Sequence, residues 1–343
     1  MSTVLIDSMD TALARHLLAL VREDPAVERI VDSGFPSGAS IDDGAGTGAV
    51  DVVLTAPGAG PDRDGSRLGG VDTDGAARLL ERLDHLPIRS LVVVSSAMVY
   101  GAWPANPVPI SEDAALRPNP ECSYAMDRAE LERRAAEFVR RHPDVLLIIV
   151  RPTLTIAGDS EAVDWLERSL WHDSSVRSGD GGPPGQFLLL EDLARAIEHL
   201  RRAQLPGVFN VAPEGWLTAR RQVELNGTAE RGSWPATAVA AVVEARWLLQ
   251  ATSTPPEMLA YVRHPWVVAT DRLRSTGWEA SATNDQAYVL GSRPGMWSSL
   301  TGRRRQEVSL AAMVAVLIGL VGVAVSSLRR RARRVAAGDD RSG

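Results

Sequence analysis

Short apolar runs alternate with amphipathic stretches along the first half of the chain. Five runs rich in Val, Ile and Leu have the length of buried strands: residues 4–6, 29–31, 51–55, 89–96 and 144–152. Three stretches carry Leu, Ala and Val at helical spacing: residues 11–23, 74–86 and 124–142. Continuous apolar strands separated by helices are typical of a parallel sheet covered on both faces. The pattern therefore predicts a doubly wound α/β fold.

The first half of the predicted α/β fold is shorter than a complete one. Residues 35–50, FPSGASIDDGAGTGAV, have no helical period and no apolar strand, so we expect a loop where a complete half would hold another strand and helix. Beyond residue 160 the alternation loosens into loops, helices near 191–203 and 236–250, and a Trp-rich stretch. We therefore expect a first domain over residues 1–160 and a smaller lobe over 161–295, interleaved with the core.

Residues 308–328 contain no charged side chain, and arginines flank them on both sides. At ~1.5 Å per residue, a helix of this length covers about 30 Å, the thickness of a bilayer core. A buried core helix is the alternative, although such helices rarely lack a polar face over this length. The sequence predicts one transmembrane helix over 308–328, between a basic linker (296–307) and a basic tail (329–343). Membrane lipid is therefore an expected partner.

Charge is unevenly distributed along the chain. Residues 303–343 hold nine arginines and three acidic residues, which leaves 28 basic and 40 acidic residues in the preceding body. An acidic body argues against nucleic acid as a partner. The chain does not open with a secretory signal pattern, and long domains follow the charge rule poorly. We therefore expect a single-pass protein of the cell membrane with a cytoplasmic body.

Few residue types offer metal or thiol chemistry. Cys122 is the single cysteine, so no internal disulfide can form, and the six histidines show no metal-ligand spacing. No metal site is expected. Every basic residue is arginine, because the chain contains no lysine.

Three motifs suggest a family. SSAMVYG (residues 95–101) follows an apolar strand, SYAMDR (123–128) opens a helix, and FNVAPEGWL (209–217) follows a helical stretch. In this order they resemble the extended short-chain dehydrogenases/reductases, the NAD-dependent epimerase/dehydratase family, over most of residues 1–290. The resemblance implies a Rossmann-like dinucleotide-binding domain, NAD or NADP as the cofactor, and a small-molecule substrate.

The resemblance also implies the catalytic residues. In this family a serine, a tyrosine and a lysine carry the chemistry, and the matching positions are Ser96, Tyr124 and Arg128. A phenol with a pKa of about 10 acts as a base near neutral pH only beside a cation. Arginine keeps the positive charge of lysine but not its shape. The alternative is that Tyr124 merely packs and Arg128 is solvated.

The glycine motif of the family, TGxxGxxG, corresponds to residues 7–14, which contain no glycine. Ser8 and Thr11 stand where glycines form the tight turn and let the pyrophosphate approach, whereas Ala14 is a tolerable replacement for the third glycine. Asp7 and Asp10 would stabilise the following helix as caps but repel a phosphate. The resemblance therefore implies a degenerate cofactor loop.

The resemblance implies cofactor contacts in two further segments. Asp32 is the candidate for the acidic residue that binds the adenosine ribose, although it stands about two residues early and suits a turn equally well. A glycine-containing loop after the next strand is partly kept in TAPGAG, which places Thr55, Ala56 and Pro57 at the cofactor.

Two functions remain open at this point. The first is a membrane-tethered, NAD(P)-dependent epimerase/dehydratase-like oxidoreductase of reduced activity, acting on a hydrophobic or sugar-linked substrate. The second is a catalytically inactive relative that serves as a membrane-bound binding or scaffold module. The assembly also stays open, with a homodimer as one option.

Overall fold

A computed structural model of the chain describes six stretches, which belong to one compact unit over residues 1–292. The described residues are 2–7, 11–32, 48–56, 73–157, 182–226 and 256–291. The predicted transmembrane helix, linker and tail, the helix near 236–250 and most of the loop 35–50 lie outside them. Within the described stretches, no helix is both long and apolar enough to cross a membrane.

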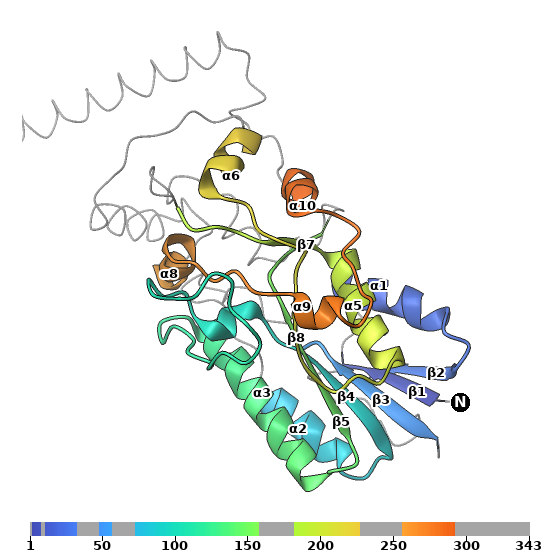
Figure 1. The fold of residues 1–343 in the computed structure, drawn as a ribbon. Coiled ribbons are helices and arrows are strands. Elements are labelled where there is room, and N and C mark those ends of the chain that lie inside the picture. Colours follow the sequence, from blue (N-terminus) through green and yellow to red (C-terminus); the bar gives the residue numbers. More distant parts are fainter. Residues whose placement is uncertain are drawn as a thin grey trace, which may run out of the picture. The chain divides into compact units, whose positions relative to one another are not determined.

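Six parallel strands form the central sheet of the described chain, in the order β2-β1-β3-β4-β5-β8 (Figure 1). Their bounds are β1 Ser2–Ile6, β2 Val27–Asp32, β3 Ala49–Leu54, β4 Ile88–Val94, β5 Leu146–Pro152 and β8 Gly207–Val211. The five predicted strands are confirmed, and so is the parallel α/β class. The strand order reverses between β1 and β3, where ligands of such sheets bind at the carboxyl ends.

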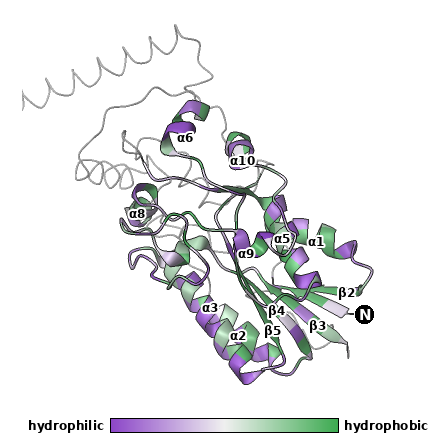
Figure 2. Cartoon of the chain, viewed as in Figure 1, coloured by the Kyte–Doolittle hydropathy of each residue, from purple (hydrophilic) through white to green (hydrophobic). Residues whose placement is uncertain are grey.

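Helices cover both faces of this sheet (Figure 1). Helices α1 (Ala12–Arg22) and α5 (Leu190–Arg202) pack on one face, and α2 (Thr73–Leu83) and α3 (Ser123–Arg141) pack on the other. Side chains alternate along each strand, so Val4 and Ile6 of β1 belong to the α1–α5 core, whereas Leu5 belongs to the α2–α3 core. Both faces are buried, and Figure 2 accordingly shows apolar strands between helices with polar outer sides.

A second group of short elements lies outside the six-stranded sheet. These are the 3-10 helix η1 (Ala97–Tyr100), strands β6 (Leu154–Ile156) and β7 (Phe187–Leu189), helices α6 (Ala219–Asn226), α8 (Leu259–Arg263), α9 (Asp271–Arg274) and α10 (Asn284–Gly291), and the 3-10 helix η2 (Pro256–Met258). One apolar cluster joins Met98 of η1 and Tyr124 of α3 to Phe187, Tyr261 and Tyr288. The predicted small lobe thus contacts the segment that carries the candidate catalytic tyrosine. Its boundary near residue 160 remains a prediction.

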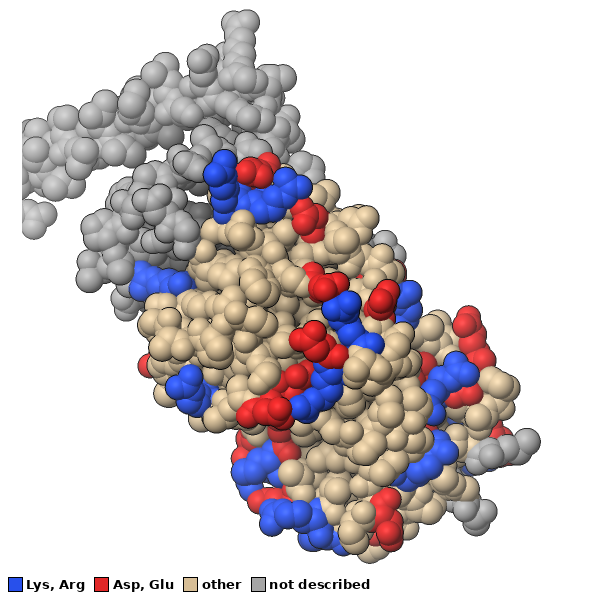
Figure 3. Space-filling model, viewed as in Figure 1, with Lys and Arg blue, Asp and Glu red and all other residues tan. Residues whose placement is uncertain are grey.

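Many exposed arginines are paired with carboxylates. Arg272 pairs with Asp113 and Arg274 pairs with Glu214, each at 2.8 Å. Blue and red side chains are accordingly interspersed on the face shown in Figure 3. Surface pairs of this kind contribute little to stability individually.

A buried ion cluster closes the amino-terminal end of the sheet. The guanidinium of Arg201, 1% exposed, contacts Asp51 at 2.8 Å, Asp24 at 2.5 Å and Glu198 at 2.7 Å. Burial alone would raise the pKa of Asp51, but the hydrogen bonds from Arg89 and Ser90 and the charges of both arginines hold it below its usual value. The cluster ties the end of α5 to the start of β3.

We predict that Arg201→Met lowers the free energy of unfolding by about 3–5 kcal/mol, because it leaves buried carboxylates without their cation. The matched control is Arg202→Met, since the Arg202 side chain is 52% exposed, and its expected effect is within about 1 kcal/mol. Urea unfolding of the full-length protein measures both. Equal losses in the two variants would show that the cluster does not anchor α5.

Candidate active site

The candidate residues lie where β1, β3 and β4 end. Asp7 follows β1, Thr55 follows β3, and Ser95 and Ser96 follow β4. Since these strands are parallel neighbours, their carboxyl ends meet at one edge of the sheet. The first turn of α3 brings Tyr124 to the same region, because α3 packs on β4, β5 and η1.

Asp7 is fully buried and fastens β1 to the end of β3. Its carboxylate accepts hydrogen bonds from the Thr55 backbone N–H at 2.9 Å, the Thr55 hydroxyl at 2.6 Å and the Ala56 N–H at 2.6 Å. Burial raises the pKa of this carboxyl, against these hydrogen bonds and the charge of Arg128. The bonds also hold Ala56 at a φ of +40°, a conformation that non-glycine residues rarely adopt.

The expectation that Asp7 caps the following helix is wrong. Thr11 is the cap of α1, and its Oγ1 accepts the backbone N–H of Ala14 at 3.1 Å. Asp7 instead faces the sheet, because the Thr55 and Ala56 donors lie there. Its carboxyl therefore joins the end of β1 to the end of β3.

The other predicted cofactor residues are placed in part. Ala14 is fully buried in the core of α1 and α5, as a small residue at a close helix–strand contact should be. Asp32 ends β2. Ser8, Asp10 and Pro57 lie outside the described residues.

Arg128 is buried beside Tyr124, so the alternative of a solvated arginine is wrong. It is 5% exposed, and its Nη1 donates to the carbonyl oxygens of Thr55 at 2.9 Å and Val94 at 2.6 Å. Its Cζ lies 5.2 Å from the centre of the Tyr124 ring, and Tyr124 itself is 7% exposed. The guanidinium thus joins the ends of β3 and β4 and places a cation against the phenol.

Two polar atoms near Tyr124 are buried without a hydrogen-bond partner in the described part of the protein. They are Nε of Arg128 and Oγ of Ser123. Buried polar atoms are rarely left unpaired, so such atoms call for a functional explanation. A hydroxyl-bearing ligand would supply the missing partners.

Ser96 lies between β4 and η1 in an extended conformation. Its Oγ accepts the backbone N–H of Met98 at 3.2 Å and so caps η1. Because η1 packs against α3, the elements that carry Ser96 and Tyr124 are in contact.

Cys122 offers no nucleophile. The thiol is buried, lies 3.7 Å from the Met258 sulfur, and its pKa is raised by burial to about 12. Within the described ranges, no three His, Cys, Asp or Glu side chains are placed to hold a metal ion.

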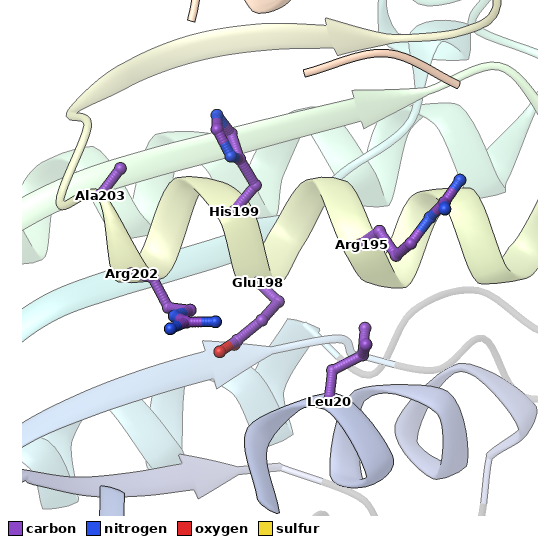
Figure 4. A pocket seen from close by; sticks show the side chains of 6 residues that line it. All are labelled: Leu20, Arg195, Glu198, His199, Arg202 and Ala203. Atoms are coloured by element: carbon purple, nitrogen blue, oxygen red, sulfur yellow. The ribbon is translucent and has the colours of Figure 1, made fainter. Parts of the chain in front are cut away.

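A surface groove of about 500 Å³ lies between α1 and α5 (Figure 4). It is lined by Leu20, Arg195, Glu198, His199, Arg202 and Ala203. Helices α1 and α5 cover the opposite face of the sheet from α3, so this groove is separate from Tyr124 and Arg128.

A doubly wound sheet with a serine, a tyrosine and a buried cation at its carboxyl edge defines a short-chain dehydrogenase/reductase type of site. The sequence profile of the NAD dependent epimerase/dehydratase family matches residues 39–212. The chain belongs to this family. NAD or NADP is accordingly the cofactor class that its fold takes.

Uncharacterized proteins of Mycobacterium tuberculosis and Mycobacterium bovis are each 27% identical to the chain over 248 residues, which cover 70% of this chain. The match spans 65% of the length of these curated relatives.

Three solved structures are similar in fold. RMD from Pseudomonas aeruginosa with NADPH has a TM-score of 0.56 at 17% identity, and UDP-glucose 4-epimerase from Thermotoga maritima with UDP-glucose has 0.55 at 15%. Each match covers 84% of this chain and 97% of the other. The dTDP-glucose 4,6-dehydratase from Bacillus anthracis with NAD has 0.52 at 14%, covering 85% and 95%.

The described residues fit a dinucleotide. The Asp7 carboxyl accepts hydrogen bonds from the end of β3, and the first turn of α1, which begins at Ala12, holds no acidic residue. On the other side, Arg128 keeps a buried Nε–H without an acceptor. Thr11 and Ala14 would lie at the pyrophosphate, and Tyr124 and Arg128 at the reacting end.

We predict that Asp7→Asn lowers the free energy of unfolding by about 1–3 kcal/mol, because the amide presents N–H groups to backbone donors. The exposed Asp74, whose side chain is 80% accessible, provides the control Asp74→Asn, with an expected change within about 0.5 kcal/mol. Urea unfolding measures both. Unchanged stability of Asp7→Asn would show that the carboxylate does not fasten the strand ends.

Proposed function

We propose that the protein is a membrane-tethered, NAD- or NADP-dependent oxidoreductase of the epimerase/dehydratase type. The observation that carries this proposal is the buried guanidinium of Arg128, 5.2 Å from the ring centre of Tyr124 at the carboxyl edge of a doubly wound sheet. A cation held against a phenol favours the phenolate, which is the form that accepts a proton.

Three side chains of the site would take part in the reaction. Tyr124 exchanges a proton with a substrate hydroxyl or carbonyl, and Ser96 donates a hydrogen bond to the same oxygen. Arg128 stabilises the phenolate through its charge. The chemistry that a nicotinamide cofactor would supply at this site is hydride transfer. Burial strengthens each of these electrostatic contributions, since Ser96, Tyr124 and Arg128 are each less than one-tenth exposed.

A sugar-linked substrate is the class that the comparisons support best. The similar epimerase from Thermotoga maritima holds UDP-glucose, and the similar dehydratase from Bacillus anthracis acts on dTDP-glucose by its name. We extend this chemistry to the chain as part of the proposal. A span over residues 308–328 would hold the site at a membrane, which suits a lipid-linked sugar or another hydrophobic substrate.

A catalytically inactive binding module is the second candidate. It is favoured by the two carbonyl oxygens that Arg128 Nη1 already binds, since they give the arginine a structural role. The glycine-free residues 7–14 favour it as well. Cofactor binding together with turnover separates the two functions.

We predict that the full-length protein in mild detergent binds NADH or NADPH, detected by energy transfer from tryptophan and by calorimetry. Tyr124→Phe keeps this binding, because it removes only the phenolic hydroxyl. It lowers turnover of a nucleotide-sugar panel, followed by nicotinamide absorbance, by about 10²–10⁴-fold, the usual contribution of a positioned acid or base.

The matched control is Tyr288→Phe, because Tyr288 is buried in the same apolar cluster as Tyr124, but its hydroxyl donates to the Gln222 carbonyl of α6. Turnover should be unchanged in that variant. Absence of binding at millimolar NADH and NADPH would exclude the oxidoreductase function. Binding without turnover of any substrate would favour the catalytically inactive binding module.

A further inference from the structure

A buried ion pair joins α3 to the end of β5 near the candidate active site. Arg151 donates to Glu132 through Nε at 2.9 Å and through Nη2 at 2.6 Å, and both side chains are about 5% exposed. A bidentate pair of this kind fixes orientation as well as distance. It therefore sets how α3 lies along the sheet.

The same carboxylate holds the residue next to Ser96. Ser95 Oγ donates to Glu132 Oε1 at 2.5 Å, and the Ser95 N–H donates to the Val150 carbonyl at 2.7 Å. Ser95 is 2% exposed, so this hydrogen bond is shielded from water.

The direction of the Ser95 side chain constrains Ser96. The backbone at Ser96 is extended, with φ −154° and ψ 147°, and consecutive side chains of an extended segment point to opposite sides. With Ser95 fastened to Glu132, the Ser96 hydroxyl is directed away from Glu132 and toward its hydrogen bond with Met98.

Glu132 lies on the same helix as Tyr124. Tyr124, Arg128 and Glu132 are spaced at i, i+4 and i+8 on α3, and all three are buried on one helix face. Holding Glu132 against Ser95 therefore holds the first turn of α3 against the end of β4.

Further hydrogen bonds keep Arg151 in place. Its Nη1 donates to the Tyr100 hydroxyl at 2.7 Å, and that hydroxyl donates to Asn210 Oδ1 at 2.8 Å. The pair is thus supported by η1 and β8 as well as by β5.

We propose that Ser95 and Glu132 are positioning residues, whose hydrogen bond sets the Ser96 hydroxyl against the Tyr124 phenol. This proposal rests on the proposed function, in which Ser96 and Tyr124 act on one oxygen. Neither residue need touch substrate or cofactor, because both act through their chain neighbours.

The test compares Ser95→Ala, directly after β4, with a substitution of a serine inside β4. Ser90→Ala is the matched control, because Ser90 is also fully buried and donates to a buried carboxylate, Asp51 Oδ1 at 2.7 Å, but at the opposite end of β4. Each variant loses one buried serine–carboxylate hydrogen bond. We expect both melting temperatures to fall by a similar amount, about 2–4 °C.

The specific readout is the Tyr124 ring signal in the full-length protein labelled with ¹³Cζ-tyrosine. The chain has four tyrosines, and Tyr124→Phe assigns the signal. Ser95→Ala should shift this signal and raise its titration midpoint by about 0.5 pH unit or more, because a displaced Ser96 no longer stabilises the phenolate. Ser90→Ala should leave it unchanged, and Ser95→Thr, which retains the hydroxyl, should restore it.

A Tyr124 signal that is the same in Ser95→Ala as in the unsubstituted protein would overturn the proposal, and so would an equal change in Ser90→Ala. If Ser95→Ala does not fold, Ser95→Cys keeps the volume with a weak donor and should shift the signal in the same direction. NADH titration of the same samples tests the proposed function separately, because the tyrosine signal is recorded without cofactor or substrate.

Discussion

The structure around the candidate site depends on one pair of hydrogen bonds, from Nη1 of Arg128 to the carbonyl oxygens of Thr55 and Val94. Carbonyls at the ends of parallel strands have no further strand residue to bind, and in a buried place they need another donor. Arg128 supplies it for β3 and β4 at once. Its guanidinium therefore docks α3 on the sheet and simultaneously places a charge beside Tyr124.

Thr55 connects this contact to the first strand. Its N–H and hydroxyl bind Asp7, while its carbonyl binds Arg128, so one residue links the ends of β1 and β3 to α3. An arginine also joins elements at the other end of the sheet, where Arg201 pairs with three carboxylates instead of carbonyls. In a chain without lysine, the planar fork of arginine, which can bind several oxygens together, serves both ends.

The sequence predicted the strands and helices of the first half because their signals are local. β3, β4 and β5 contain runs of Val, Ile and Leu, and α1, α2 and α3 show a clear helical period. Strand β8 was missed, because Asn210 interrupts the apolar residues of GVFNV. The pairing of β6 with β7 was missed for a similar reason, since each strand has three residues.

The site was predicted less well than the fold, because its contacts are distant in sequence. Asp7 and Thr55 are separated by 48 residues, so no pattern near Asp7 shows that its carboxyl binds the end of β3. Tyr124 and Arg128 could be selected by family resemblance, yet only the structure shows the arginine bound to two carbonyls. Glu132 and Arg151 were overlooked, although a glutamate two turns after Tyr124 and an arginine ending a buried strand were visible signals.

The central claim is that Arg128, fixed by the sheet, performs the role of the cation in an NAD(P)-dependent site. Calorimetric titration of NADH into the full-length Arg128→Lys and Arg128→Met proteins, each first shown to be folded, tests it most directly. The account predicts that the lysine variant binds NADH and that the methionine variant binds it at least about tenfold more weakly, a loss of roughly 1.4 kcal/mol. Equal affinity of the methionine variant and the unsubstituted protein would contradict it.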